Sequence, residues 1–385
     1  DNVENVGHNR VLHRLVSISQ NHAFMPSRIS NRRLGSQANQ FVQMTISQKH
    51  IRQKLEELPR FKLSHLNTPL EALDRLRQAL IDEGFSVPNR LLVKRDDVTG
   101  LAFGGNKGRH FEFEMAHIIE GGFDTVININ HYHSNQARFL AAGCARVGLK
   151  YHLVSIDMVT APVTGNLLLC KLMGAEIHRT PAEYGRQVAG KIFSEVTEAG
   201  GRPYIMPDDP FADVMGMIGF LETGLELEEQ LEAAGVKGPV RFWGLTGRSI
   251  AGLKLYGKNR GLDWRATAVQ YSPGKIEDFH ETTATRASRV VEMFGLEHSF
   301  DASDFDVLNA YMGPGYGEPD DRVIEAIMMV GKAEGLVLDP NYTGKSMSGL
   351  IGEFRAGRVD PEETICFIHS GGLPQVFAHA DKFLD

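Results

Sequence analysis

The chain has 385 residues, of which 42% are hydrophobic and 23% charged, and its formal net charge at pH 7 is −7. This composition is typical of a globular protein long enough for two domains. The negative charge argues against a nucleic-acid partner. No apolar run is long enough to cross a membrane, so we expect no membrane partner either.

Residues 1–43 differ from the rest, with five arginines, no lysine and two acidic residues. We expect them to be a poorly ordered extension or leader, because they lack the apolar periodicity of a core-forming segment. An arginine-rich, acid-poor segment is typical of organellar transit leaders. A translated leader is the alternative, since a more regular sequence begins at Met44.

The three cysteines, Cys144, Cys170 and Cys366, lie far apart in apolar segments and show no metal-ligand spacing. An odd number of isolated cysteines indicates buried, reduced thiols and a reducing compartment. We therefore expect a cytoplasmic protein with no metal site, or an organellar one if residues 1–43 are a transit leader.

From Ile51 onward, short apolar runs alternate with segments of helical spacing. The expected strands are residues 91–93, 125–129, 151–155, 176–178, 203–206, 240–243, 266–271, 336–339 and 364–368. Strands that alternate with helices indicate βαβ units and a parallel sheet, so we predict an α/β fold. In such sheets ligands bind at the carboxyl ends of the strands.

The most informative stretch is KRDDVTGLAFGGNKGRH, residues 94–110, which follows one of these strands. Glycines allow the backbone to approach a bound group closely, and Lys107 comes directly after Gly104-Gly105-Asn106. A lysine in a partly dry site loses proton affinity and becomes a nucleophilic amine. The alternative is a solvated lysine in a glycine turn.

A second turn, Leu245-Thr246-Gly247-Arg248-Ser249, follows strand 240–243 and precedes a helix. Free N–H groups at such a helix start can bind a phosphate. Taken alone, the signal is weak, because many helices begin with a Ser or Thr cap.

Four motifs occur in the same order as in one family: GGNK, SNQ at residues 134–136, LDPNYTGKSMSGL and the terminal IHSGG. From about Leu63 to Leu384 the chain resembles the D-cysteine desulfhydrase and 1-aminocyclopropane-1-carboxylate (ACC) deaminase family. These are fold-type II pyridoxal-phosphate enzymes. The resemblance implies a homodimer with two three-layer αβα domains and mostly parallel sheets. We expect a large cofactor-binding domain of residues 44–109 plus 215–385 and a small domain of residues 110–214.

The resemblance also implies roles for individual residues. Lys107 would form the Schiff base with pyridoxal 5′-phosphate and move the substrate Cα proton. The other expected cofactor contacts are Asn106, Asn135, Thr246, Gly247, Arg248, Ser249 and Thr343. The expected contacts with a small amino-acid substrate are Ser134, Asn135, Gln136, His133 and Ser370, and Tyr316 and Tyr342 would flank its face. Together with Lys107, we expect Ser134, Tyr316 and Tyr342 to be catalytic.

Thr343 would face the pyridine nitrogen of the cofactor. A threonine hydroxyl can hydrogen-bond a neutral ring nitrogen, but it does not hold the nitrogen protonated as a carboxylate would. In the deaminase branch this position is typically Glu and the position of Ser370 typically Leu. The desulfhydrase branch has a hydroxyl residue at both, so this sequence falls on the desulfhydrase side.

Three places depart from the family pattern. Asn130 and His131 replace a glycine pair before SNQ, Asp208-Asp209-Pro210 replaces a Gly-Gly-Ser loop, and Arg248 replaces a glycine of the phosphate loop. Arg248 either binds an anion, on the cofactor or the substrate, or points to solvent. His131 and His133 are either acid, base or anion donors, or structural residues.

We therefore expect a lyase that performs α,β-elimination on a small β-substituted amino acid, similar to D-cysteine desulfhydrase. It would release pyruvate, ammonia and a leaving group such as sulfide. The alternatives are an ACC deaminase and a lyase for an anionic β-substituted amino acid such as cysteate. A cofactor-binding protein without turnover is a further reading, which the lost glycines motivate.

Overall fold

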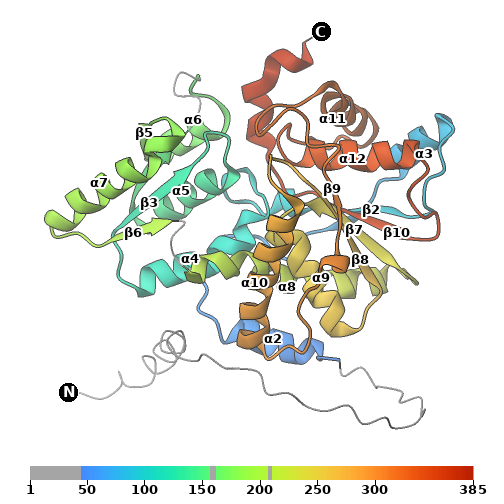
Figure 1. The fold of residues 1–385 in the computed structure, drawn as a ribbon, viewed down its shortest axis with the longest axis horizontal. Helices are drawn as coiled ribbons and strands as arrows, with labels where there is room; N and C mark the ends of the chain where they lie inside the picture. The colour runs from blue at the N-terminus through green and yellow to red at the C-terminus, as the bar shows by residue number, and fades with distance from the viewer. Residues whose placement is uncertain (1–44, 157–161, 207–209, 385) are drawn as a thin grey trace, which may run out of the picture. The chain divides into compact units, whose positions relative to one another are not determined.

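The computed structural model describes residues 45–156, 162–206 and 210–384 (Figure 1). The expected extension, residues 1–43, and the pair Asp208-Asp209 lie outside these ranges. Within them, no helix is both long and apolar enough to cross a membrane.

Two sheets organise the described chain, and helices pack on both faces of each (Figure 1). The smaller sheet has four parallel strands in the order β5-β4-β3-β6. These strands are β3 (Thr125–Asn130), β4 (Lys150–Ser155), β5 (Glu176–Arg179) and β6 (Pro203–Met206). The helices between them are α5 (Asn135–Val147), α6 (Gly165–Leu172) and α7 (Gly185–Glu198). A strand followed by a helix and a parallel strand is the βαβ unit that the sequence predicts.

The larger sheet has six strands in the order β1-β2-β10-β7-β8-β9, and only β1 runs antiparallel to its neighbour. The strands are β1 (Leu70–Ala72), β2 (Leu91–Lys94), β7 (Val240–Leu245), β8 (Trp264–Val269), β9 (Asp306–Leu308) and β10 (Thr364–Ile368). Strand β10, the last in the chain, lies between β2 and β7. This places the terminal IHSGG motif next to the strand that leads to Lys107.

The remaining helices cover the larger sheet or join the two sheets. They are α2 (Gln48–Glu56), α3 (Asp74–Asp82), α4 (Lys107–Glu120), α8 (Pro210–Ala233), α9 (Arg248–Arg260), α10 (Ile276–Phe294), α11 (Asp321–Glu334) and α12 (Thr343–Arg355). One apolar cluster, which includes Met217, Phe242 and Tyr256, lies on the side of α8 and α9. Another, which includes Val330, Leu350 and Phe367, lies on the side of α11 and α12. Apolar clusters on opposite faces of one sheet give three αβα layers.

The smaller sheet is layered in the same way. Phe139, Leu140 and Tyr151 belong to the cluster that includes residues of α5, whereas Ile127 packs with Ile192 of α7 in a separate cluster. The α/β fold with mostly parallel sheets is thus confirmed. The domain division stays a prediction, and its two expected borders fall near the starts of α4 and α8.

One predicted strand, residues 336–339, is wrong. That segment is irregular and ends in a turn organised by the buried carboxylate of Asp339. The carboxylate accepts backbone N–H bonds from Asn341 (2.9 Å), Tyr342 (2.7 Å) and Thr343 (3.0 Å). A side chain that binds successive N–H groups in this way favours a turn and a helix start over a ladder of strand pairs. The short strands β1 and β9 had not been predicted.

Candidate active site

A cavity of about 380 Å³ opens at the carboxyl ends of strands from both sheets. Asn130 and His131 contribute to it at the end of β3, Leu245 at the end of β7, and Ile368 and Ser370 at the end of β10. Its position is the one expected for a ligand site in a parallel α/β protein, and its size is in the range of small-molecule pockets.

Lys107 begins helix α4, and its half-buried side chain lines the cavity. Gly104 and Gly105 precede it with φ of 67° and 124°, values that L side chains rarely adopt. Burial lowers the pKa of Lys107 to about 8, and the positive charge of Arg248 adds to this effect. A considerable fraction of the amine is therefore neutral and nucleophilic near neutral pH.

The glycine turn before Lys107 packs directly against the terminal SGG segment. The Asn106 N–H donates to the Ser370 carbonyl oxygen at 3.0 Å. A Cβ atom added at Gly371 would lie 2.7 Å from the Cα of Gly105, closer than real Cβ contacts occur. Any side chain at this crossing would separate the two segments, so the glycines are required for the approach of Ser370 to the Lys107 turn.

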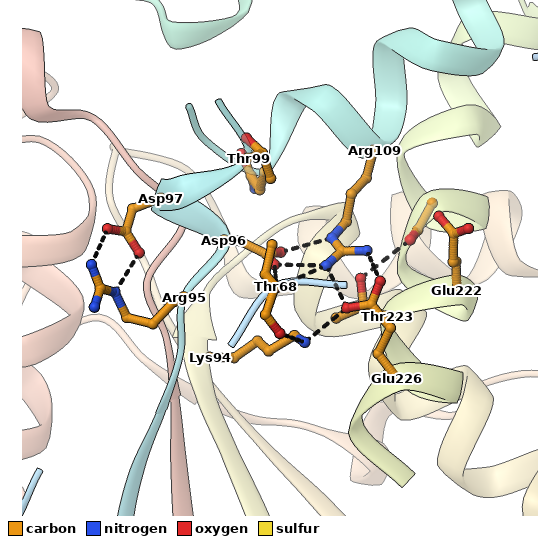
Figure 2. Close-up of polar contacts among 12 residues, drawn as sticks. Thr68, Lys94, Arg95, Asp96, Asp97, Thr99, Arg109, Glu222, Thr223 and Glu226 are labelled. Atoms are coloured by element: carbon orange, nitrogen blue, oxygen red, sulfur yellow. Dashed lines mark hydrogen bonds and ion pairs between the residues drawn. The ribbon is translucent and has the colours of Figure 1, made fainter. Parts of the chain in front are cut away.

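A buried ionic network anchors the start of α4 (Figure 2). The guanidinium of Arg109, fully buried two residues after Lys107, donates to Asp96 (2.9 Å) and to both carboxylate oxygens of Glu226 on α8 (2.8 Å each). Lys94, at the end of β2, donates to the same Glu226 at 2.8 Å. Burial opposes the charge on Arg109, but the two carboxylates hold its pKa above the ordinary value. The network joins β2, α4 and α8 and so fixes the position of the first turn of α4, which carries Lys107.

The predicted phosphate loop lines the same cavity as the SNQ turn. Helix α9 begins at Arg248, and Gly247 precedes it with a φ of 149°. Thr246, Gly247, Arg248 and Ser249 all line the cavity, as predicted. The Asn106 amide donates to the Ser249 hydroxyl at 2.8 Å, which links the Lys107 turn to this helix start. The unpaired N–H groups of a helix start can bind an anion here.

Arg248 does not point to solvent. Its guanidinium donates to the backbone oxygen of Asp213 (2.9 Å) and to the Asp213 carboxylate (3.0 Å). The same carboxylate accepts from Arg286 of α10 at 2.8 Å, and both arginines line the cavity. The three residues therefore form a charged cluster on the cavity wall.

The SNQ turn contributes Ser134, Asn135 and Gln136 to the cavity. The Ser134 hydroxyl caps α5 by accepting from the Ala137 N–H at 3.1 Å. The Asn135 side-chain oxygen accepts from the Asn166 amide at 3.0 Å. Because its oxygen is held in this way, the amide nitrogen of Asn135 is the group left to donate to a ligand.

The two histidines before this turn have different positions. His131 lines the cavity, with its ring 4.5 Å from that of Tyr316. The prediction that His133 binds substrate has no support, because His133 is 1% exposed and does not line the cavity. Its ring packs on Tyr132 (3.6 Å) and His379 (4.8 Å), in a structural position under the turn.

Three tyrosines, Tyr271, Tyr316 and Tyr342, line part of the cavity wall. The hydroxyl groups of Tyr316 and Tyr342 lie 2.6 Å apart in one hydrogen bond. Burial raises the pKa of Tyr342 well above its ordinary value, and the neighbouring tyrosines raise it further. The Tyr342 hydroxyl is therefore protonated at neutral pH. Tyr271, the third, packs on Tyr342 with ring centroids 5.2 Å apart.

Thr343 and Ser370 both line the cavity, as predicted. The Thr343 hydroxyl donates to the buried Asp339 carboxylate and accepts from the Asp339 N–H, each at 2.8 Å. Among the described residues that line the cavity there is no Asp or Glu. The hydroxyl groups of Thr343 and Ser370 therefore take the place where the resemblance puts a carboxylate and an apolar residue in deaminases.

Sequence reasoning missed several cavity residues, among them Tyr271, Ser272, Arg286 and Ser346. Tyr271 and Ser272 follow strand β8, so their place at a carboxyl strand end was a usable signal. Arg286 lies in the middle of α10 and carries no local signal of a site. Only packing brings it to the cavity.

Comparisons with known proteins agree with this geometry. A family model described as "Pyridoxal-phosphate dependent enzyme" matches residues 62–371. The chain is 33% identical over 339 residues to a 1-aminocyclopropane-1-carboxylate deaminase of Burkholderia ambifaria, which covers 86% of this chain and 98% of that protein. It is 31% identical over 341 residues to the enzyme of the same name from Pseudomonas syringae pv. tomato, with 86% and 99% covered. A crystal structure of an ACC deaminase homologue superposes with a TM-score of 0.74 at 27% identity, over 88% of this chain and 99% of that one.

The residues of the cavity fit pyridoxal phosphate. The amine of Lys107 has a lowered pKa and suits the covalent link, while the start of α9 offers N–H groups for the phosphate. When bound, the cofactor supplies an electron sink for charge that develops at the substrate Cα. Family match, sequence identity and site residues agree: the chain belongs to the family of pyridoxal-phosphate-dependent enzymes, as a fold-type II lyase of the ACC deaminase and D-cysteine desulfhydrase type.

Proposed function

We propose that the protein catalyses α,β-elimination from a small β-substituted amino acid, in the manner of a D-cysteine desulfhydrase. The Cα–H bond and the bond from Cβ to the leaving group break, and a Cα–Cβ double bond forms. The released enamine takes up water and becomes pyruvate and ammonia. For cysteine the balance is one cysteine and one water to one pyruvate, one ammonia and one hydrogen sulfide, with no net oxidation.

The pair of hydroxyl residues at Thr343 and Ser370 is the observation that carries this proposal. Both line the cavity, and no carboxylate does so among the described lining residues. Without a carboxylate to hold the cofactor ring nitrogen protonated, the electron sink is weaker. A weaker sink suits reactions in which a good leaving group departs from Cβ.

The neighbouring side chains have roles that fit the same reaction. Lys107, whose pKa is lowered to about 8 by burial, can take the Cα proton near neutral pH. Ser134 and Gln136 also line the cavity, where their hydroxyl and amide donors can bind the substrate carboxylate. Tyr316 and Tyr342, whose hydroxyls share a hydrogen bond, line the same cavity, and we propose that they flank the departing group.

ACC deamination is the second candidate, because the curated relatives with 31–33% identity are named ACC deaminases. That reaction opens a cyclopropane ring and gives 2-oxobutanoate and ammonia. It has no good leaving group, so it needs the stronger electron sink that this cavity lacks. A protein that binds the cofactor without turnover is the third reading, since Asn130, His131 and Arg248 occupy expected glycine positions.

The test is a keto-acid assay on the purified protein reconstituted with pyridoxal phosphate. D- and L-cysteine, D- and L-β-chloroalanine and ACC are each supplied, and pyruvate and 2-oxobutanoate are identified by chromatography. We expect pyruvate from at least one β-substituted enantiomer and no 2-oxobutanoate from ACC, with Lys107→Ala as the inactive control. Turnover of ACC alone would establish the second candidate, and cofactor absorbance without any keto acid would establish the third.

We extend the proposal to a homodimer and to the two-domain division at residues 110–214. Light scattering after size-exclusion chromatography tests the first. Limited proteolysis tests the domain division, and we expect cleavage near residues 110 and 214.

A further inference from the structure

We propose that Arg248 and Arg286 form an anion subsite in the cavity, and that the preferred substrate carries a second acidic group on its β-substituent. The chemical class is an amino acid whose β-substituent is either a sulfonate, which leaves as sulfite, or a thioether that ends in a carboxylate, which leaves as the carboxylate-bearing thiolate. The substrate part of this inference rests on the elimination reaction proposed above. The anion subsite itself does not.

The cluster has more positive than negative charge. The Asp213 carboxylate oxygen Oδ1 accepts from Arg248 Nη2 (3.0 Å) and from Arg286 Nε (2.8 Å). One carboxylate therefore serves two guanidinium groups, which leaves one positive charge unbalanced. The side chains of Arg248 and Arg286 are 29% and 22% exposed, and both line the cavity.

Donor groups on both arginines remain available. Within the described part of the chain, Arg286 uses only Nε and Arg248 only Nε and Nη2 in hydrogen bonds. The remaining N–H groups have the fork geometry that binds carboxylate and sulfonate oxygens in pairs. Asp213 fixes the two side chains in place, so a ligand does not have to order them.

The electrostatic effects on neighbouring groups agree with an unbalanced charge. Burial lowers the pKa of Arg286, and the nearby charge of Arg248 lowers it further, which outweighs the opposing effect of Asp213. A bound anion would relieve both the repulsion between the guanidinium groups and the loss of hydration. The repulsion between the two guanidinium groups and their loss of hydration destabilise the empty subsite, and an anionic ligand would offset both effects.

The position of the subsite connects it to the substrate. Arg248 lies close enough to Lys107 to lower the pKa of its amine, in addition to the larger effect of burial. Burial raises the pKa of Tyr271, and Arg248 and Arg286 act against that rise, so both are near this tyrosine. Tyr271 in turn packs on Tyr316 and Tyr342, with ring centroids 6.3 and 5.2 Å away. The arginine pair therefore continues the wall where the proposed leaving group would depart.

The decisive experiment uses two substrates that differ only in charge. S-carboxymethylcysteine and its neutral amide, S-carbamoylmethylcysteine, are compared as D and L enantiomers on the holoenzyme. We expect kcat/KM to be about ten- to a hundredfold higher for the acid, the range of a charge-assisted hydrogen bond. We expect Arg286→Gln to remove this preference while the rate with the amide stays within about threefold. Cysteate, assayed through sulfite release, tests the sulfonate arm.

Arg289→Gln is the matched control, because Arg289 lies on the same helix, is exposed and does not line the cavity. It removes the same charge and is expected to leave the preference unchanged. Arg286→Lys keeps the charge but not the fork, and we expect it to retain only part of the preference. The melting temperature of each variant shows that it is folded, and Arg286→Met replaces Arg286→Gln if the latter does not fold.

A binding measurement separates this inference from the proposed reaction. Calorimetry on the holoenzyme compares 3-sulfopropanoate, which has no amino group and does not react, with butanoate. Tighter binding of the dianion that Arg286→Gln abolishes supports the subsite even if no amino acid is eliminated. Equal binding of both ligands, or equal kcat/KM for acid and amide, overturns it. A loss of pyridoxal-phosphate affinity in Arg286→Gln with no change in charge preference would assign the arginines to the cofactor phosphate and also overturn it.

Discussion

The hydroxyl group of Thr343 donates a 2.8 Å hydrogen bond to the buried carboxylate of Asp339. Burial raises the pKa of Asp339, while the hydrogen bonds it receives, first from Thr343, act in the opposite direction. The single hydroxyl hydrogen of Thr343 is thus already engaged. In the proposed arrangement, Thr343 would have to turn that hydrogen away from Asp339 in order to donate to the cofactor ring nitrogen, and this would further weaken the cofactor as an electron sink.

Replacing Thr343 by Glu and Ser370 by Leu should lower the rate of β-elimination by about ten- to a hundredfold. This is the range expected when the neutral hydroxyl hydrogen-bonding partner at position 343 is replaced by a charged carboxylate. The variant should gain slow turnover of ACC if the cavity still admits it, since a carboxylate holds the ring nitrogen protonated. The measurement is kcat for pyruvate and 2-oxobutanoate formation. An unchanged elimination rate would contradict both the role proposed for Thr343 and the assignment of this protein to the desulfhydrase branch.

Lys107→Ala should remove both the visible absorbance of the bound cofactor and all lyase activity. Among the described lysines, Lys345 is the competitor, because burial lowers its pKa to about 8 as well. Its ammonium group donates to the backbone oxygens of Tyr271 and Gly315, and it does not line the cavity. A folded Lys345→Met variant should therefore keep the band. Retention of absorbance and turnover in Lys107→Ala would refute the assignment.

Reconstitution of the cofactor-free protein should depend on pH through the Lys107 amine. Burial, assisted by Arg248, lowers the pKa of this amine from 10.5 to about 8. Only the neutral amine attacks the cofactor aldehyde, so the rate should rise as pH increases toward 8 and level off above it. Stopped-flow absorbance from pH 6.5 to 9.5 measures this. A rate that continues to rise through pH 9.5 would indicate an amine with an ordinary pKa.

Arg109→Met should destabilise the protein by about 3–5 kcal/mol, because it leaves Asp96 and Glu226 as buried carboxylates without their main partner. Arg355→Met is the control. Its ion pair with Glu325 is 31% and 50% exposed, and a pair of that kind contributes about 1 kcal/mol or less. Urea denaturation followed by circular dichroism gives both values. Similar losses in the two variants would show that the network does not anchor α4 as described.

Local sequence was sufficient for most elements of the described fold. Apolar runs such as residues 364–368 predicted β10 with its observed bounds, because a strand buried on both faces reads as a continuous apolar segment. The turn motifs predicted many of the cavity residues, since βαβ topology brings the carboxyl ends of the parallel strands of one sheet to the same edge. Lys107, Asn135 and Thr246 were found in this way.

Tertiary structure decided what depends on partners distant in the chain. The edge strands β1 and β9 have three residues each, and strands so short are set by their neighbours more than by their own propensity. Residues 336–339 have the composition of a strand, but they are irregular, because Asp339 binds the N–H groups of residues 341–343 and so fixes a turn directly after them. His133 follows a strand as a ligand residue would, yet packing turns it into the core. Arg248, Asp213 and Arg286 come from three helices, and only their packing makes one charged cluster beside Lys107.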